Sequence, residues 1–396
     1  MSFSQSQVSA ARVMVVGCGA LGNEVLKNLV LMGVMHIVVV DFDIVETGNL
    51  TRSVFFTKED AEQRRKKAMV MAERLQQLNM AVEVMPICGD IAYDVGLGLI
   101  RQMDVVISCV DSRWARFCIN RHCMRAGIPW VDGGIDGLEG TARVFAPGRN
   151  CYACNLGPEG LNDLARRMPC SGMIRRQEQA GSAPTTSVIA SVIGAVEVQE
   201  ALKIVESGKR IKNLELRIKN LESGKRKVES EGENSLCGRM FYYEGESMSV
   251  RVARYQGYDD TCPEHEQWSP VQRTTVSVTT SVGDALQCWS DELDVQGSEV
   301  TMCLTNDCFV DYVSRRDNDQ RTVVMLPGRR VEDFVGQDAE LGGLPLSAFY
   351  QHEYRHIDAA FPYPELTLAQ LGIPPRDIVR VTAGGREAFF ELRIEN

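Results

Sequence analysis

The sequence predicts an α/β protein in which a doubly wound, largely parallel sheet is followed by a smaller α+β module. Short apolar runs typical of buried strands alternate with helix-periodic segments between Val13 and Ala146, and a glycine-rich turn joins the first run to its helix. The pattern changes at Pro270 to mixed strands and short helices. With 396 residues the chain is too long for one simple core, so we expect domains over 1–267 and 268–396.

The first strand, turn and helix have the pattern of a nucleotide-binding unit. Val13–Val16 is an apolar run, and a G-x-G-x-x-G turn follows it and opens a helix that ends near Gly33. A second strand, His36–Val40, stops at Asp41, where an acidic residue holds a ribose hydroxyl in such folds. Glycines let backbone N–H groups approach phosphates, and a helix N-terminus favours negative charge. The glycines of the turn are Gly17, Gly19 and Gly22.

The alternation continues along the chain. The expected strands are Ala81–Ile87, Val105–Val110 and Thr141–Ala146. The expected helices are Asp60–Asn79, Arg113–Ala126, a nearly all-apolar buried helix at Thr185–Val205, and Leu366–Ile373 in the second domain. The stretch 206–235 is rich in Lys, Glu, Gly and Ser, which is typical of an exposed polar insertion, and the chain should close with a hairpin around Gly384 and Gly385.

Composition excludes several classes of function. The net charge of −10 argues against nucleic acid as a main partner. No apolar run reaches the roughly 18 residues of a membrane-spanning helix, and the N-terminus lacks an apolar signal region, so we expect a cytoplasmic protein with no membrane partner. The 13 cysteines suggest reduced thiols, with a metal site or a nucleophile among them.

Polar residues gather where the expected strands end, at the edge where open α/β sheets bind ligands. A lone glycine fingerprint is most typical of an NAD-dependent dehydrogenase. Two carboxylates with Asn, Arg and Lys suit a triphosphate with Mg²⁺ better, because cations neutralise phosphate and a carboxylate holds the hard metal. Taken singly, Lys67 is most often a solvated helix residue and Asp111 a helix N-cap. The edge residues are Asp41, Asn49, Arg52, Lys67 and Asp111.

Two short motifs have zinc-ligand spacing. Cys151 and Cys154 form C-x-x-C, and Cys262 and His265 form C-x-x-H, so each pair places two ligands on one tight turn. Two such turns can close a tetrahedral structural zinc site. The alternatives are four unligated residues or a redox C-x-x-C, which is disfavoured because Cys151 does not open a helix after a strand.

Cys170 stands apart in a polar loop. It lies between arginine pairs at 166–167 and 175–176, and nearby cations favour the thiolate, which is the nucleophilic form. From the residues alone, a partly buried loop cysteine is the slightly better interpretation. His352 and His356 have the i, i+4 spacing of a helical metal pair but lack the H-E-x-x-H pattern, so we assign them no site.

Several longer sequence segments together resemble a known family. They are VVGCGALGNEVLKNLVLMG, VVVDFDIVETGNLTRSVFF, KKAMVMAERLQQLN, SCVDSRWARFCIN, VDGGIDGLEGTARVFAPGRNCYAC and TTSVIASVIGAVEVQEALKI. Over about residues 11–267 the chain resembles the ThiF/MoeB adenylating superfamily, which activates ubiquitin-like proteins and sulfur carriers. These motifs are most similar to those of the catalytic subunits of eukaryotic heterodimeric activating enzymes. The phrase LTLAQLGIPPRDIVRV and the hairpin after it resemble their ubiquitin-fold domain.

The resemblance implies a Rossmann-like adenylation domain with an ATP site built from the glycine turn and the edge residues. Asp41 would hold the ribose, and Asp111 would bind Mg²⁺ and position the attacked α-phosphate. The residues that would contact the phosphates are Gly17, Gly19, Gly22, Asn49, Arg52 and Lys67.

It also implies a thioester site and a structural Zn²⁺ site. MPCSGMI sits where relatives carry the thioester-forming cysteine, so Cys170 would take the acyl group, within a short catalytic-cysteine segment at 155–184. The zinc ligands would be Cys151, Cys154, Cys262 and His265, and the last stands where the family usually has a fourth cysteine.

The implied activity is ATP-dependent activation of a ubiquitin-like protein, followed by transfer to a conjugating-enzyme cysteine. The ubiquitin-fold-like domain at 268–396 would recruit the conjugating enzyme, and the protein would act as a homodimer or a heterodimer. The alternative is a sulfur-carrier adenylyltransferase of the thiamin or molybdopterin type, which forms no thioester. A non-catalytic scaffold is a third hypothesis, disfavoured by the intact set Arg52, Lys67 and Asp111.

Overall fold

The computed structural model describes residues 4–157, 159–160, 164, 186–218, 235–254, 257–295, 299–305, 307–315, 323–334 and 340–394. These residues form two compact units, which are described separately. The first unit holds the described residues of 4–91, 100–157 and 186–267. The second, here called the C-terminal unit, holds 92–99, 159–160, 164 and the described residues from 268 onward.

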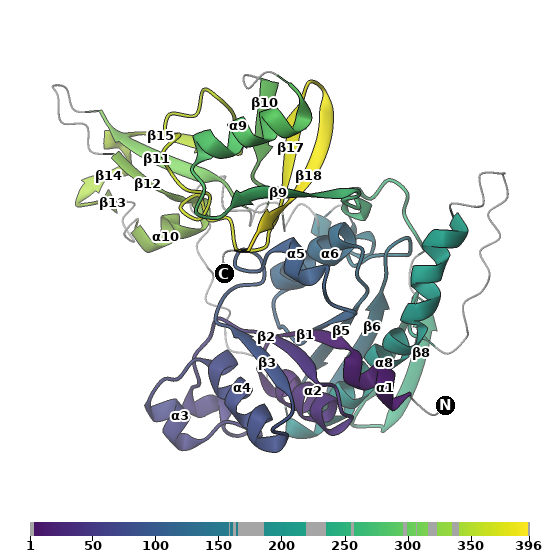
Figure 1. Ribbon diagram of the computed structural model, residues 1–396. Coiled ribbons are helices and arrows are strands. Elements are labelled where there is room, and N and C mark those ends of the chain that lie inside the picture. The colour runs from purple at the N-terminus through teal and green to yellow at the C-terminus, as the bar shows by residue number, and fades with distance from the viewer. Residues whose placement is uncertain are drawn as a thin grey trace. The chain divides into compact units, whose positions relative to one another are not determined.

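The first unit is built on a mixed sheet that is parallel over its first five strands (Figure 1). The strand order is β3-β2-β1-β4-β5-β6-β7-β8, with parallel pairing from β3 to β5 and antiparallel pairing from β5 to β8. The strands are β1 (Arg12–Val16), β2 (His36–Val40), β3 (Glu83–Ile87), β4 (Val105–Ser108), β5 (Trp130–Asp136), β6 (Glu139–Phe145), β7 (Arg239–Glu244) and β8 (Ser249–Arg254). The predicted α/β class is confirmed.

The strand order places a topological switch point beside β1. The chain runs outward from β1 to β2 and β3, then returns to add β4 on the other side of β1. In open parallel sheets the crevice at such a point, outside the carboxyl ends of the strands, is where ligands bind. The loops after β1, β2 and β4 carry the glycine turn and the polar residues singled out in the sequence.

Helices cover both faces of this sheet, as strand alternation requires. Val13 and Val15 point into a core shared with α2, α4 and α8, whereas Met14 and Val16 point to the opposite face. On that opposite face α6 packs against β4 and β5 (Figure 1). The helices of this unit include α1 (Gln5–Ala10), α2 (Ala20–Leu31), α3 (Lys58–Glu62), α4 (Lys67–Leu78), α6 (Arg113–Ala126) and α8 (Ser187–Ile218), while α5 (Leu97–Ile100) spans the boundary between the units.

The prediction of one helix over Asp60–Asn79 is wrong, because α3 and α4 are separate helices. Between them Arg64 adopts a left-handed φ of +49°. The backbone N–H of Arg65 donates to the Asp60 carbonyl at 3.0 Å, and its guanidinium donates to the buried Asp60 carboxylate at 2.9 Å. Asp60 therefore stabilises the turn between the two helices, and α4 begins at Lys67 instead of continuing from α3.

The buried helix predicted at Thr185–Val205 is also longer in the structure. Its described part, α8, runs on to Ile218 and so enters the polar segment. Its apolar face packs on the sheet through residues such as Val198 and Leu202.

The C-terminal unit contains a five-stranded sheet in the order β16-β10-β17-β18-β9, with α9 (Val282–Leu293) packed on one face. The first of these strands in the chain, β9, lies parallel to the last, β18. A three-stranded sheet, β12-β11-β15, and a short pair, β13-β14, complete its described strands. The bounds are β9 (Val271–Ser277), β10 (Val300–Cys303), β11 (Phe309–Ser314), β12 (Val323–Pro327), β13 (Glu340–Leu341), β14 (Leu344–Pro345), β15 (Phe349–Tyr354), β16 (His356–Ile357), β17 (Ile378–Ala383), β18 (Arg386–Arg393) and the helix α10 (Val331–Phe334).

Two expectations for this unit meet different outcomes. The closing hairpin is confirmed, since β17 and β18 pair antiparallel around Gly384 and Gly385. The helix over Leu366–Ile373 is wrong, because this stretch forms turns, with Leu368 and Leu371 buried in the α9 core. His352 and His356 lie on strands β15 and β16, so they form no helical pair.

Candidate active site

The glycine turn after β1 uses its three glycines in different ways. Gly17 has a φ of +95°, and its N–H donates to the Val40 carbonyl at 2.8 Å. A Cβ on Gly22 would lie 1.9 Å from the Gly17 carbonyl oxygen, so the close approach of turn and helix requires glycine there. A Cβ on Gly19, the N-cap of α2, would meet no atom within 4 Å. The fold itself therefore gives no packing reason for glycine at position 19.

Asp41 connects the glycine turn to the loop after β2. Its carboxylate accepts hydrogen bonds from the N–H of Cys18 at 2.6 Å and from the N–H of Asp43 at 2.8 Å. Burial raises the pKa of Asp41 against the opposing effects of Lys67 and of these two N–H groups. The residue predicted to hold a ribose thus lies directly beside the turn predicted to hold phosphates.

Lys67 is a buried cation at the same edge. It is the first residue of α4, is 8% exposed, and its Nζ donates to the Asp43 carboxylate at 2.8 Å. Burial lowers the pKa of Lys67, but Asp41 and Asp43 outweigh that effect and raise it overall. The interpretation of Lys67 as a solvated helix residue is therefore wrong. Asp43 was not among the predicted site residues, although D-x-D directly after a buried strand is a signal that could have suggested it.

Asn49 and Arg52 shape the loop that follows. The Asn49 side-chain oxygen accepts from the N–H of Glu46 at 2.9 Å and closes a 3₁₀ turn at Thr47–Asn49. Arg52 donates from Nη1 to the Gly48 carbonyl at 3.1 Å. Within the described part of the chain, no carboxylate pairs with Arg52, and no hydrogen bond joins Asn49 or Arg52 to Lys67.

Asp111 follows β4 and is exposed. It is not the N-cap of α6. That role belongs to Ser112, whose hydroxyl accepts from the N–H of Ala115 at 3.4 Å. Among the described residues, the Asp111 carboxylate has no hydrogen-bond partner. Burial lowers the pKa of Arg116, but the charge of Asp132 and, to a smaller extent, that of Asp111 raise it overall. An exposed carboxylate released from capping can serve as a metal ligand.

Together these groups fit a nucleoside triphosphate. The open side of Gly19 and the first N–H groups of α2 offer backbone donors to an anion. Lys67 and Arg52 supply cations, and Asp111 supplies a carboxylate that the described part of the structure does not otherwise use.

The predicted zinc ligands lie together in one cluster. The Sγ atoms of Cys151 and Cys154 are 3.6 Å apart, those of Cys151 and Cys262 are 3.8 Å apart, and Cys154 Sγ lies 3.1 Å from His265 Nε2. All four ligand atoms lie within 4.8 Å of one another. Tetrahedral zinc with Zn–S bonds of about 2.3 Å would separate its sulfurs by about 3.8 Å. The arrangement therefore has the size and donor set of a tetrahedral zinc site.

Neighbouring residues hold the two halves of this cluster in place. Arg121 on α6 makes two hydrogen bonds to the Glu264 carboxylate, at 2.9 and 2.8 Å, beside His265. Asn120, also on α6, accepts from the N–H of Tyr152 at 2.9 Å. One helix thus supports both turns, although their cysteines are more than a hundred residues apart in the sequence.

Cys170 lies outside the described residues, so the structure gives no position for the predicted thioester site. Four other cysteines lie in apolar stretches of the sequence, where burial is expected. Cys18, Cys118 and Cys123 are buried, whereas Cys109 is half-buried.

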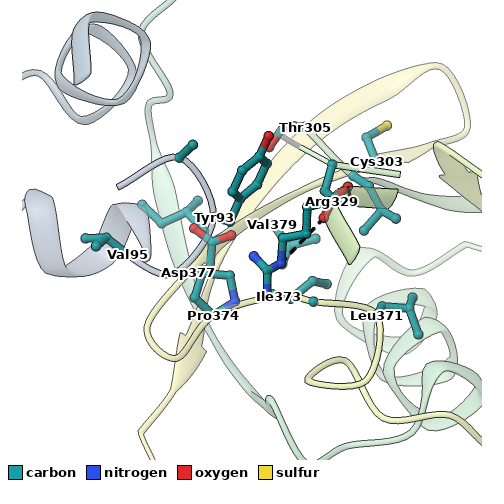
Figure 2. Close-up of a pocket in the computed structure, with 15 residues that line it drawn as sticks. Tyr93, Val95, Cys303, Thr305, Arg329, Leu371, Ile373, Pro374, Asp377 and Val379 are labelled. Carbon is teal, nitrogen blue, oxygen red and sulfur yellow. Dashed lines mark hydrogen bonds and ion pairs between the residues drawn. The ribbon is translucent and has the colours of Figure 1, made fainter. Parts of the chain in front are cut away.

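A separate pocket lies wholly within the C-terminal unit (Figure 2). Figure 2 shows the Arg329 side chain beside Tyr93, and the guanidinium carbon lies 5.3 Å from the centre of the Tyr93 ring. Arg329 is 3.4 Å from the Asp94 carboxylate and 3.8 Å from that of Asp307, and burial raises the pKa of Asp307 to about 6. Arg329 is thus paired with two carboxylates and offers no surplus positive charge to a triphosphate, so we do not assign the nucleotide to this pocket.

Among the described helices, none combines the length and apolar character needed to cross a membrane.

Comparison with known proteins agrees with the geometry of the first unit. The family model described as "ThiF family" matches residues 2–264. The chain is 33% identical over 201 residues to the adenylyltransferase and sulfurtransferase MOCS3 of Mus musculus, covering 50% of this chain and 41% of the mouse protein. It thus spans about two fifths of the length of that mammalian relative.

Two microbial relatives are covered more fully. A sulfur carrier protein adenylyltransferase of Thermus thermophilus is 32% identical over 207 residues, which are 51% of this chain and 71% of that protein. The SAMP-activating enzyme E1 of Haloferax volcanii is 29% identical over 259 residues, which are 65% of this chain and 82% of that protein. With the family model matching well over half of the sequence, this chain belongs to the ThiF family.

Proposed function

We propose that this chain uses ATP to activate the C-terminal carboxylate of a small ubiquitin-like protein. The observation that carries the proposal is the linked set at the switch point, in which the glycine turn, Asp41, Asp43 and Lys67 are joined by hydrogen bonds. Gly19 leaves the turn open toward an anion, and the relatives are adenylyltransferases and an activating enzyme by name.

The first step is an in-line displacement at the α-phosphorus. A carboxylate oxygen of the modifier forms a bond to the α-phosphorus, and the bond from that phosphorus to the bridging oxygen breaks. The products are an acyl-adenylate and pyrophosphate. Lys67 and Arg52 neutralise charge on the phosphates, and Asp41 orients the ribose. Mg²⁺, held by Asp111, would neutralise further phosphate charge.

The second step is thioester formation on Cys170. The thiolate attacks the acyl carbon, AMP leaves, and a conjugating-enzyme thiolate then displaces Cys170 in the same way. The resemblance of MPCSGMI to the thioester motif of activating enzymes supports this step. We propose that the C-terminal unit, with a ubiquitin-like fold, recruits the conjugating enzyme, and that the enzyme is a cytoplasmic homodimer or heterodimer.

The four-ligand cluster supports a structural role for Zn²⁺. Its three sulfurs and one imidazole nitrogen would cross-link the turn after β6 to the segment that ends the first unit. In this proposal zinc takes no part in adenylation.

The alternative is a sulfur-carrier adenylyltransferase that stops at the acyl-adenylate. The Thermus relative, named for that activity, favours it. Replacing Cys170 with Ala separates the two functions, with small proteins ending in glycine from neighbouring genes as substrates.

The thioester mechanism predicts a DTT-sensitive adduct between modifier and enzyme that the C170A variant lacks, while ATP–pyrophosphate exchange continues. A DTT-sensitive adduct in C170A would place the thioester on another residue. Modifier-dependent exchange without any adduct in the parent enzyme would favour the sulfur-carrier activity.

A further inference from the structure

The Asp111 carboxylate needs a fixed position if it is to hold a metal, yet its own side chain contributes nothing to that position. It is exposed and, within the described part of the chain, makes no hydrogen bond. The position of the loop between β4 and α6 must therefore come from neighbouring residues. Residues at both ends of this loop make hydrogen bonds to one carboxylate, that of Asp132.

Asp132 on β5 is fully buried, with 0% of its surface exposed. It lies opposite Ser108 in the parallel pairing of β4 and β5. Its Oδ1 accepts from Ser108 Oγ at 3.2 Å and from Arg116 Nε at 2.9 Å. Ser108 is the last residue of β4 and Arg116 lies in the first turn of α6. One carboxylate oxygen therefore holds both ends of the loop that carries Asp111.

The charge of Asp132 is shared by a second arginine. Its Oδ2 accepts from Arg143 Nη2, and the guanidinium of Arg116 also donates to the Gly133 carbonyl at 3.1 Å. The nearby carboxyl of Glu197 has no hydrogen-bond partner for either oxygen, and its burial raises its pKa well above the ordinary value. Asp132, unlike Glu197, makes ion pairs with both Arg116 and Arg143.

The other side of the loop is fixed against the glycine turn. The N–H of Cys109 donates to the Val16 carbonyl at 2.8 Å. The Cys109 carbonyl lies so close to Gly17 that a Cβ there would come within 2.6 Å of its oxygen. The loop is therefore held in register with the phosphate-binding turn on one side and by Asp132 on the other.

We infer that Asp132 is a positioning residue for Asp111: by binding Ser108 and Arg116 it holds the β4–α6 loop in the geometry that lets Asp111 take Mg²⁺ with ATP. The inference rests on the proposed function for its metal and nucleotide. It goes beyond that function by assigning a role to a residue with no exposed surface. The rival explanation is that the ion pairs only stabilise the fold, as buried pairs commonly do.

Asp132→Asn tests the inference, because the amide keeps the shape but removes the charge. Ser108→Ala is the milder second variant, which removes one anchor and leaves the ion pairs intact, and it decides the matter if D132N does not fold. Asp136→Asn is the matched control, since Asp136 lies on the same strand but is exposed.

The first readout is amide hydrogen exchange in protein without nucleotide, followed for peptides that cover 109–112. Exchange there should be faster in D132N and S108A and unchanged in D136N, while peptides from β1 and β2 keep their protection. Equal exchange in folded D132N or S108A and the parent would overturn the inference. This readout does not depend on the proposed activity.

The second readout is binding of ATP measured by calorimetry at increasing Mg²⁺. The Mg²⁺ concentration for half-maximal ATP binding should rise about tenfold or more in D132N, as for other losses of outer-shell support, and less in S108A. Binding without Mg²⁺ should not change. A uniform loss of ATP affinity at every Mg²⁺ concentration would show a merely structural role. Absence of ATP binding in the parent protein would instead contradict the proposed function.

Discussion

Replacing Gly19 with Ala should separate what the fold requires from what a bound nucleotide requires. The new Cβ would meet no protein atom within 4 Å, and the backbone at this residue, with φ −69° and ψ −158°, is open to any L-amino acid. Alanine is a poorer N-cap than glycine by roughly 1 kcal/mol, but it also lowers the entropy of the unfolded chain, which offsets part of that cost. The unfolding free energy of G19A should therefore lie within about 1 kcal/mol of the parent.

Gly22→Ala is the matched variant in the same turn. Its Cβ would lie 1.9 Å from the Gly17 carbonyl oxygen, which is backbone and cannot swing aside. The helix or the turn must shift, at a cost of about 2 kcal/mol or more. G22A should therefore lose stability, whereas G19A should not.

The expected effect on ATP is the reverse for G19A. A side chain at the N-cap of α2 would stand where phosphate oxygens approach the first N–H groups of the helix. Losing one hydrogen bond to a charged group is worth about 1.5–3 kcal/mol, which corresponds to roughly 10- to 150-fold in affinity.

Urea denaturation and calorimetric titration with MgATP measure the two effects on the same preparations. We expect parent-like stability with weakened ATP binding for G19A. If G19A binds ATP as tightly as the parent, the glycine turn is not the phosphate site, and the ATP proposal fails with it.

Three further outcomes are expected. The pKa of Glu197 is raised in the folded state, so its effect on stability does not change with pH below about pH 4.5 and becomes more unfavourable above it. The unfolding free energy of E197Q relative to the parent should therefore grow by about 1.4 kcal/mol per pH unit above pH 4.5, and a constant difference in denaturation experiments would contradict this. The pKa of Asp307 is raised to about 6, so the unfolding free energy of D307N relative to the parent should increase by up to about 3 kcal/mol between pH 4 and pH 7 and no further above pH 7. A difference in urea denaturation that does not change over this range would contradict it. Native mass spectrometry should find one Zn²⁺ per chain, retained in His265→Cys and weakened about tenfold or more in His265→Ala; tight zinc in H265A would remove His265 from the ligand set.

Much of the first unit could be predicted because its signals are local. The apolar strands, the G-x-G-x-x-G turn and the acidic residue at the end of β2 lie within one short stretch, and each has a physical reason visible in the sequence. The zinc motifs were similarly clear, since each half is a four-residue pattern. Their meeting across more than a hundred residues was an inference from ligand chemistry that the cluster agrees with.

The errors arose where a distant or buried partner decides the local structure. Helix periodicity over Asp60–Asn79 is continuous, yet the buried Asp60 carboxylate and a left-handed Arg64 divide it into two helices. Leu366–Ile373 has helical spacing but forms turns, because its leucines fill the core under α9.

The same limit applies to the candidate site. Residue type alone does not distinguish Lys67 from a surface lysine, and only the family resemblance assigned it to the phosphates. Its pairing with Asp43 and its burial are features of the tertiary structure. Asp132 has no motif of its own, and its role depends on strand register that brings Ser108 opposite it and on a helix that returns Arg116. Such partners belong to tertiary structure, and single-sequence periodicity does not contain them.

Acyl-adenylation at the switch point is tested most directly by modifier-dependent ATP–pyrophosphate exchange. The parent protein should exchange labelled pyrophosphate into ATP only when a small protein ending in glycine is present. Asp111→Ala should abolish the exchange while keeping the fold, since Asp111 is exposed and does not cap α6. Exchange at the parent rate in D111A, or its absence in the parent with every such protein, would contradict the proposed function.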